Sequence, residues 1–142
     1  MSNTSAIKEI VYTARVEFGD CDPAGIVWFP NFFRWIDAAS RHFFAECGVP
    51  RWEETTETLG VIGTPLVDTH TRFVKAASYG DTLQIAVRIK EWREKSFVQT
   101  YRVTRGEDLI LECEEVRIFG AKREGGGIRA VQIPPSIRVL CE

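Results

Sequence analysis

The longest regular pattern in the chain lies between residues 30 and 47. Apolar residues recur there every three or four positions, which predicts an amphipathic helix with one buried face. That face consists of Phe32, Trp35, Ile36, Ala39 and Phe43. Pro30 suits the first helical position, where no N–H is needed, and Gly48 followed by Pro50 is typical of a helix end. A short polar helix is expected next, over residues 51–59.

Elsewhere apolar and polar residues alternate with a period of two, which predicts strands. The expected strands cover residues 9–18, 61–75, 81–92, 95–104, 108–121 and 128–133. Glycine-containing turn sequences separate the later strands, around Gly80, Gly106 and Gly125–Gly127. One long helix and five or six antiparallel strands, polar on one face, predict an α+β fold in which the sheet packs on the helix.

Length and composition are those of one globular domain. The chain has 142 residues, of which 44% are hydrophobic and 27% charged, and no linker or repeat divides residues 1–142. A net charge of -2 gives no reason to expect nucleic acid or an anionic membrane as partner. We find neither a signal-peptide pattern nor an apolar run of about 20 residues, so a cytoplasmic protein without membrane contact is expected.

The cysteines and histidines indicate neither a metal nor a disulfide framework. Four cysteines contain no C-x-x-C pair, and the chain has only His42 and His70. We therefore expect no metal site and no cofactor. Cys21 lies in the most polar loop, but a thiolate nucleophile needs a base, and neither histidine is near it in the sequence.

That loop, residues 17–31, reads EFGDCDPAGIVWFPN and contains the most candidate functional residues of any segment. Pro23 and Gly25 predict a turn directly after Asp22. A carboxylate then lies just before a helix N-terminus, whose unpaired N–H groups favour a second, developing anion. This suggests acyl-transfer chemistry, whereas the simpler alternative makes Asp22 only a turn former or cap. Asp20 is expected to brace the loop by accepting backbone N–H bonds.

Five sequence blocks resemble the 4-hydroxybenzoyl-CoA thioesterase family of hotdog-fold enzymes. They are DCDPAGIV with the following PNFFRWID, GTP at residues 63–65, ASYGD at 77–81, KEWREKSFVQ at 90–99 and IRAVQIP at 128–134. Together they cover nearly the whole chain. The resemblance implies a hotdog fold, in which an antiparallel sheet of five to six strands wraps around one long central helix. It also implies a homotetramer built from hotdog dimers.

The resemblance implies catalytic roles as well. Asp22 matches the catalytic carboxylate, acting either as nucleophile, through an acyl-enzyme anhydride, or as general base on water. The backbone N–H of Phe29 is expected to polarise the thioester carbonyl, although relatives often carry Tyr there. Asp37 matches the acceptor of a ring hydroxyl, unless it is a solvated helix carboxylate. Trp28 is a candidate wall of an aryl pocket, and Thr64 is expected to orient a water or the carbonyl.

Coenzyme A requires surface cations for its phosphates. By resemblance these are Arg93, Lys95 and Arg129, while Glu94 departs from a more basic pattern. CoA is then part of the substrate rather than a cofactor. The favoured function is hydrolysis of an aromatic acyl-CoA, with 4-hydroxybenzoyl-CoA as the best single substrate.

Two other functions stay open from the sequence. One is a thioesterase for short aliphatic acyl-CoA or acyl-carrier-protein substrates, and the other is a non-catalytic acyl-CoA-binding hotdog module. A hotdog dehydratase is disfavoured because it needs a histidine in the active-site loop.

Overall fold

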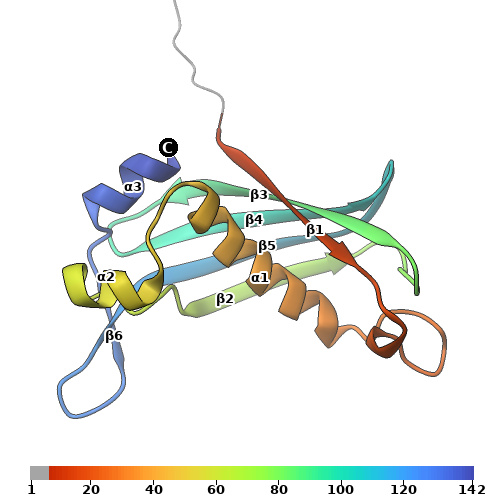
Figure 1. Ribbon diagram of the computed structural model, residues 1–142, viewed down its shortest axis with the longest axis horizontal. Helices are drawn as coiled ribbons and strands as arrows, with labels where there is room; N and C mark the ends of the chain where they lie inside the picture. Colours follow the sequence, from red (N-terminus) through yellow and green to blue (C-terminus); the bar gives the residue numbers. More distant parts are fainter. Residues whose placement is uncertain (1–6) are drawn as a thin grey trace, which may run out of the picture.

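A single antiparallel sheet and three helices make up residues 7–142, the part of the chain that the computed structural model describes. The first six residues of the expected 1–142 domain, and with them most of the segment searched for a signal peptide, lie outside the described residues. The strands are β1 (Glu9–Arg15), β2 (Leu66–Phe73), β3 (Thr82–Trp92), β4 (Ser96–Arg105), β5 (Asp108–Lys122) and β6 (Ile128–Val131). Their order is β1-β3-β4-β5-β2, and β6 pairs with the last residues of β5 (Figure 1).

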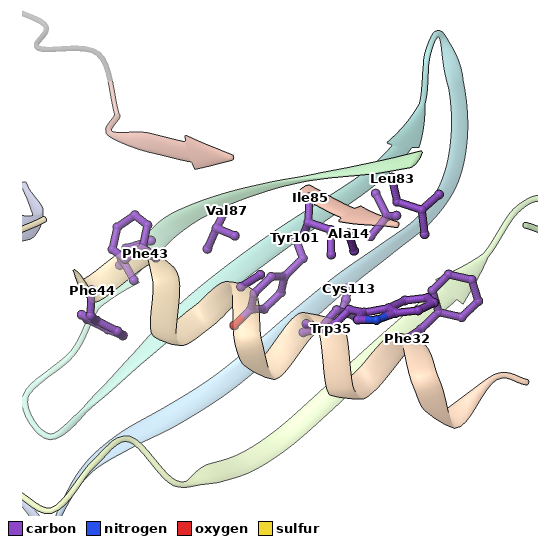
Figure 2. Close-up of a cluster of buried hydrophobic side chains, with 14 of the residues drawn as sticks. Ala14, Phe32, Trp35, Phe43, Phe44, Leu83, Ile85, Val87, Tyr101 and Cys113 are labelled. Atoms are coloured by element: carbon purple, nitrogen blue, oxygen red, sulfur yellow. The ribbon is translucent and has the colours of Figure 1, made fainter. Parts of the chain in front are cut away.

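The helices are α1 (Pro30–Glu46), α2 (Trp52–Leu59) and α3 (Pro135–Cys141). Helix α1 lies across one face of the sheet, and its predicted apolar stripe is buried against the strands. Figure 2 shows this contact, with aromatic rings of α1 facing Leu83, Ile85 and Val87 of β3. Each fully buried apolar side chain contributes about 2 kcal/mol compared with the same side chain exposed to water. The apolar stripe of α1 and the alternate, buried apolar residues of β3 therefore hold the helix on the sheet.

Several element boundaries differ from those expected, and one helix was not expected. Strand β1 ends at Arg15, because the chain turns into a short 3-10 helix at Phe18–Asp20. Strand β2 begins at Leu66, because the preceding segment contains Gly63, with φ +151°, and Pro65, which do not fit a regular ladder. Helix α3 was not predicted; it begins at a proline and buries Ile137 and Cys141.

Strand β2 forms one edge of the sheet. Among the described residues it pairs only with β5, and nearly all of its side chains are exposed. The exposed ones include large apolar groups, Leu66, Val67 and Phe73. A long apolar edge is a template for pairing with another chain, so a single copy leaves this surface uncovered.

Candidate active site

The predicted turn places Asp22 at the base of a tight loop. The Gly25 N–H donates to the Asp22 carbonyl at 2.9 Å, and Gly25 takes φ +81°, which a residue with a side chain rarely adopts. The Ala24 N–H donates to Oδ1 of Asp22 at 2.9 Å. Oδ2 has no hydrogen-bond partner within residues 7–142. The carboxylate is therefore oriented through one oxygen, and the other is available for chemistry.

The start of α1 offers one free backbone donor. Pro30 has no N–H, and the N–H groups of Asn31 and Phe32 already donate to the carbonyls of Trp28 and Phe29. The Phe29 N–H meets no acceptor in the described part of the chain. The positive end of the helix dipole adds to its attraction for negative charge. The Phe29 N–H is therefore unpaired at the start of the helix, and its role as a catalytic donor stays a prediction.

Asp20 connects the loop to the helix. Its Oδ2 accepts the Glu17 N–H at 2.8 Å and its Oδ1 accepts from Arg34 of α1 at 2.9 Å. Its carbonyl accepts the Trp28 N–H and the Asn31 side-chain amide. The expectation that Asp20 braces the loop thus agrees with its contacts. Asp22 and Phe29 thus lie in one loop, and hydrogen bonds from Trp28 and Asn31 to the Asp20 carbonyl join its beginning to its end.

The turn between β2 and β3 supports this loop from outside. The Val27 N–H donates to the Ala77 carbonyl at 2.8 Å. Asp81 closes the turn by accepting the Ser78 N–H and an Arg105 N–H, both at 2.9 Å. The Ser78 N–H bond and the Arg105 guanidinium hold the pKa of Asp81 below its usual value, despite some desolvation. The ASYGD block thus has a structural role in supporting the Asp22 loop.

Asp37 and Thr64 lie together, at a cavity of about 760 Å³ beside α1. The walls combine apolar and cationic groups: Phe33, Trp52, Ile62, Pro65, Ile128, Arg41 and Arg117. Oδ1 of Asp37 accepts from Arg117 at 3.1 Å, and the Thr64 carbonyl accepts from the same guanidinium at 2.9 Å. Asp37 is thus neither a purely solvated helix carboxylate nor fully enclosed. The cavity in one chain includes neither Asp22 nor Phe29.

A glycine brings the Thr64 segment close to the sheet. The Gly120 N–H donates to the Gly63 carbonyl, and a Cβ at Gly120 would lie 2.9 Å from Ile128 and 3.1 Å from Pro65. Any side chain there would push these two cavity walls apart.

The aromatic residues divide between core and surface. Phe32 and Trp35 are buried in the core and Phe33 lines the cavity, whereas Trp28 is exposed and is not among the residues that line it. In one chain the structure therefore does not bring Trp28 to the cavity.

The expected phosphate-binding residues lie at the other end of α1 from Asp22. Arg93 and Lys95 occupy the β3–β4 turn, where neighbouring Phe97 packs on Phe44 near the C-terminal end of α1. Arg129 lies on β6, and a hydrogen bond from the Ile133 N–H to the Glu94 carbonyl joins the segment after β6 to this turn. All three cations are exposed, and Arg93 is paired with Glu91. Figure 1 shows β6 and the β3–β4 turn at one end of the molecule and the loop before α1 at the other.

Sequence reasoning missed the buried pair of Glu115 and Arg117 on β5, which carries the contacts to Asp37 and Thr64. The signal was two charged residues of opposite sign, two positions apart, on an otherwise apolar strand face. Nothing in that spacing indicates a partner 80 residues away.

The thiols and histidines form no second reactive centre within the described residues. All four cysteines are free thiols, and the one hydrogen bond of the Cys21 thiol within the described residues goes to the Glu17 carbonyl, at 3.9 Å. His42 is near Glu46, on the last turns of α1, and His70 is on β2. Residues 7–142 contain no group of His, Cys, Asp and Glu arranged to hold a metal ion. No helix in this part of the chain is long and apolar enough to cross a membrane.

A sheet wrapped on one long helix, with a carboxylate in the loop before the helix and a free N–H at its start, defines a hotdog thioesterase. The model of the thioesterase-like superfamily matches residues 16–139, and the chain belongs to this family. A relative, 4-hydroxybenzoyl-CoA thioesterase from Pseudomonas sp. (strain CBS-3), is 49% identical over 139 residues, which are 94% of this chain and 98% of the relative.

Solved structures agree with this assignment. The structure of 4-hydroxybenzoyl-CoA thioesterase from Pseudomonas sp. strain CBS-3 has a TM-score of 0.90 and 47% identity, covering 96% of this chain and 100% of the other. An aspartate-to-asparagine variant of 4-hydroxybenzoyl-CoA thioesterase, complexed with 4-hydroxybenzoyl-CoA, has a TM-score of 0.89 and 47% identity over 94% of this chain and 99% of that one. A gentisyl-coenzyme A thioesterase is similar at 32% identity with a TM-score of 0.78, over 93% and 98% of the two chains. The predicted family, hotdog fold and thioester-hydrolase class are confirmed.

Proposed function

We propose that this chain hydrolyses 4-hydroxybenzoyl-CoA to 4-hydroxybenzoate and coenzyme A. The observation that carries the proposal is one loop that holds two groups. One is the Asp22 carboxylate, whose Oδ2 has no hydrogen-bond partner in the described residues, and the other is the unpaired N–H of Phe29. The 49% identical relative is a 4-hydroxybenzoyl-CoA thioesterase. The related structure that holds 4-hydroxybenzoyl-CoA is of a variant in which an aspartate is replaced by asparagine, as expected if an aspartate is needed for hydrolysis.

In the nucleophilic form of the reaction, Oδ2 of Asp22 attacks the thioester carbon. The carbonyl oxygen becomes an oxyanion, which the Phe29 N–H and the helix N-terminus stabilise. The C–S bond then breaks, CoA leaves as thiolate, and a mixed anhydride joins Asp22 to the acyl group. Water cleaves the anhydride and restores the carboxylate. In the alternative form Asp22 takes a proton from water, and the resulting hydroxide attacks the thioester directly.

Replacing Asp22 with Asn tests the site. Asp22→Asn keeps the Oδ1 acceptor for Ala24 but removes the charge, so we expect kcat to fall by about 10³ or more while the fold persists. Glu57→Gln, an exposed carboxylate-to-amide change on α2, is the matched control. Steady-state hydrolysis and thermal unfolding of both variants provide the measurement. Unchanged turnover in Asp22→Asn would remove Asp22 from the chemistry.

The two forms of the reaction differ in the fate of the oxygen from water. Turnover in H₂¹⁸O labels the Asp22 carboxylate only if an anhydride forms and water attacks its aspartyl carbonyl. Mass spectrometry of the Asp22 peptide after many turnovers detects this label. Label confined to the product excludes only an anhydride that water opens at its aspartyl carbonyl, and it fits both the general-base form and attack of water on the acyl carbonyl of the anhydride.

The ring and the nucleotide are assigned to separate groups. We assign the ring hydroxyl to Asp37, with Thr64 and Trp28 near the acyl group, and the CoA phosphates to Arg93, Lys95 and Arg129. Rates with benzoyl-, 4-hydroxybenzoyl-, phenylacetyl- and butyryl-CoA distinguish the candidates. Preference for butyryl-CoA would favour the short-chain thioesterase, and binding without hydrolysis would favour the acyl-CoA-binding module.

The same chain is proposed to work as a homotetramer built from hotdog dimers. In one copy, Asp22 and the proposed phosphate-binding cations flank opposite ends of α1, whose 17 residues span about 25 Å. Two copies joined antiparallel along their β2 edges would bring the N-terminal end of one α1 towards the C-terminal end of the other. A complete site then takes residues from both copies.

We place this function in the cytoplasm and assign it no metal or cofactor. The four free thiols suit a reducing compartment. Dialysis against EDTA is expected to leave the hydrolysis rate unchanged, and a loss that Zn²⁺ or Mg²⁺ restores would contradict this.

A further inference from the structure

Arg117 is a buried cation in the middle of β5. Only 6% of its side-chain surface is exposed, and each of its three nitrogens has a different partner. Nε donates to Glu115 at 2.8 Å, Nη1 to the Thr64 carbonyl at 2.9 Å and Nη2 to Asp37 at 3.1 Å. One guanidinium therefore joins the sheet, the segment before β2 and helix α1, using the planar fork that lysine lacks.

The charge of Arg117 is already balanced without Asp37. Glu115 lies two residues away on the same face of β5, and its side chain is only 3% exposed, so the two form a buried ion pair. Asp37, by contrast, has 75% of its side chain exposed and needs no counter-ion to be tolerated there. Neither charge therefore needs the contact between Arg117 and Asp37 for its own neutralisation. The effect of the contact is to orient a carboxylate that would otherwise turn freely.

The orientation matters because of what the three groups line. Asp37, Thr64 and Arg117 all border the same cavity. Oδ1 of Asp37 is occupied by Arg117, and Oδ2 has no hydrogen-bond partner within the described residues. A hydroxyl on a ligand would find one fixed acceptor there rather than a carboxylate turning freely in water.

A buried hydrogen-bonded group lies beside the ion pair, because Gln99 on β4 is the cross-strand partner of Glu115. The Tyr101 hydroxyl and the Ser40 hydroxyl both donate to the Gln99 side-chain carbonyl, at 2.8 and 2.7 Å. Burial, with the charge of Glu115 adding to it, raises the pKa of Tyr101 well above its ordinary value. Tyr101, whose hydroxyl points towards α1 in Figure 2, therefore stays a neutral donor beside the pair.

We propose that Arg117 is a positioning residue that sets selectivity for hydroxylated acyl rings by fixing the Asp37 carboxylate and the Thr64 carbonyl at the cavity. This inference rests on the proposed function, because it concerns the same substrate. Arg117 acts through Asp37 and does not touch the reacting atoms.

The test compares the kcat/KM ratio of 4-hydroxybenzoyl-CoA to benzoyl-CoA in four variants. Arg117→Lys keeps the charge but loses the fork, and the Glu115→Gln/Arg117→Met double variant removes the pair without leaving a buried charge unpaired. We expect both to lower the ratio by about tenfold, mainly through KM for the hydroxylated substrate, with benzoyl-CoA little changed. Asp37→Asn should lower the ratio similarly, and adding it to the double variant should cause no further fall.

The matched control is Arg102→Lys, since Arg102 forms an exposed pair with Glu112 on a neighbouring strand. Its ratio should equal that of the wild type. If the double variant does not fold, Arg117→Lys decides alone. An unchanged ratio, or an equal loss for both substrates, overturns the inference. Failure of the wild type to hydrolyse either thioester would instead overturn the proposed function.

Discussion

At the scale of single residues, the geometry of the Asp22 loop depends on local backbone rules. Asp22 and Gly25 close a turn, and Pro30 removes one N–H at the helix start, which leaves Phe29 as the free donor. These are effects of neighbours a few positions apart, so they could be predicted from the sequence.

The Phe29 N–H can be removed separately from its ring. Phe29 has φ -53°, which proline also adopts, so Phe29→Pro deletes the donor with little change at this residue. We expect kcat to fall by about 10²–10³ with KM little changed. Phe29→Ala keeps the N–H and loses the ring, and it should retain most of kcat. Equal kcat values for the two variants, at equal thermal stability, would contradict the role of this N–H.

At the scale of elements, the turn between β2 and β3 holds the Asp22 loop. Its carboxylate, Asp81, connects Ser78 and Arg105, while the neighbouring Ala77 carbonyl accepts the Val27 N–H. Loop and turn come from sequence segments about 50 residues apart, and the turn motif by itself does not show which segment it supports.

Asp81 makes stability depend on pH in a defined direction. Because its pKa is lower in the folded state than in the unfolded chain, its contribution is fully present above the unfolded value of about 3.9. The contribution is lost as the pH falls through the folded-state pKa. Asp81→Asn should therefore be destabilised by about 1 kcal/mol at pH 7, and the gap to the wild type should shrink below about pH 4.

Urea unfolding between pH 7 and pH 3 measures this gap. Glu57→Gln serves again as the control and should follow the wild type at each pH. A gap that stays constant down to pH 3 would show that Asp81 does not contribute through its charge.

At the scale of the whole molecule, the open β2 edge and the separated site residues point to the same assembly. The edge exposes apolar side chains that one chain leaves uncovered, and the proposed site needs groups from both ends of α1. Pairing of two copies at this edge would cover the apolar side chains of β2 and bring the two groups of proposed site residues closer together.

A lysine on the edge tests the assembly. Val67 is 59% exposed on β2, and Val67→Lys should shift the protein to a smaller species in sedimentation velocity and reduce hydrolysis in parallel. Val139→Lys, at a 65% exposed valine on α3, is the matched control and should keep both mass and activity. A fully active wild-type monomer would contradict the shared site.

Mixing two damaged chains tests the sharing directly. In a dimer of one Asp22→Asn copy and one Asp37→Asn copy, one of the two sites receives both intact aspartates. Activity with 4-hydroxybenzoyl-CoA should then exceed the mean of the two parent variants. No gain after subunit exchange, verified by mass, would place Asp22 and Asp37 of one site in the same chain.

The sequence alone determined the long helix, most of the strands and the Asp22 loop, because each follows from residues within a few positions of one another. It also carried the family resemblance, which the comparisons confirm. Only the tertiary structure decided that Arg117 donates a hydrogen bond to Asp37, that β2 starts at Leu66, and that the phosphate-binding candidates lie away from Asp22. Periodicity shows which face of an element is buried, but contacts between distant segments depend on strand order and register, which periodicity does not specify.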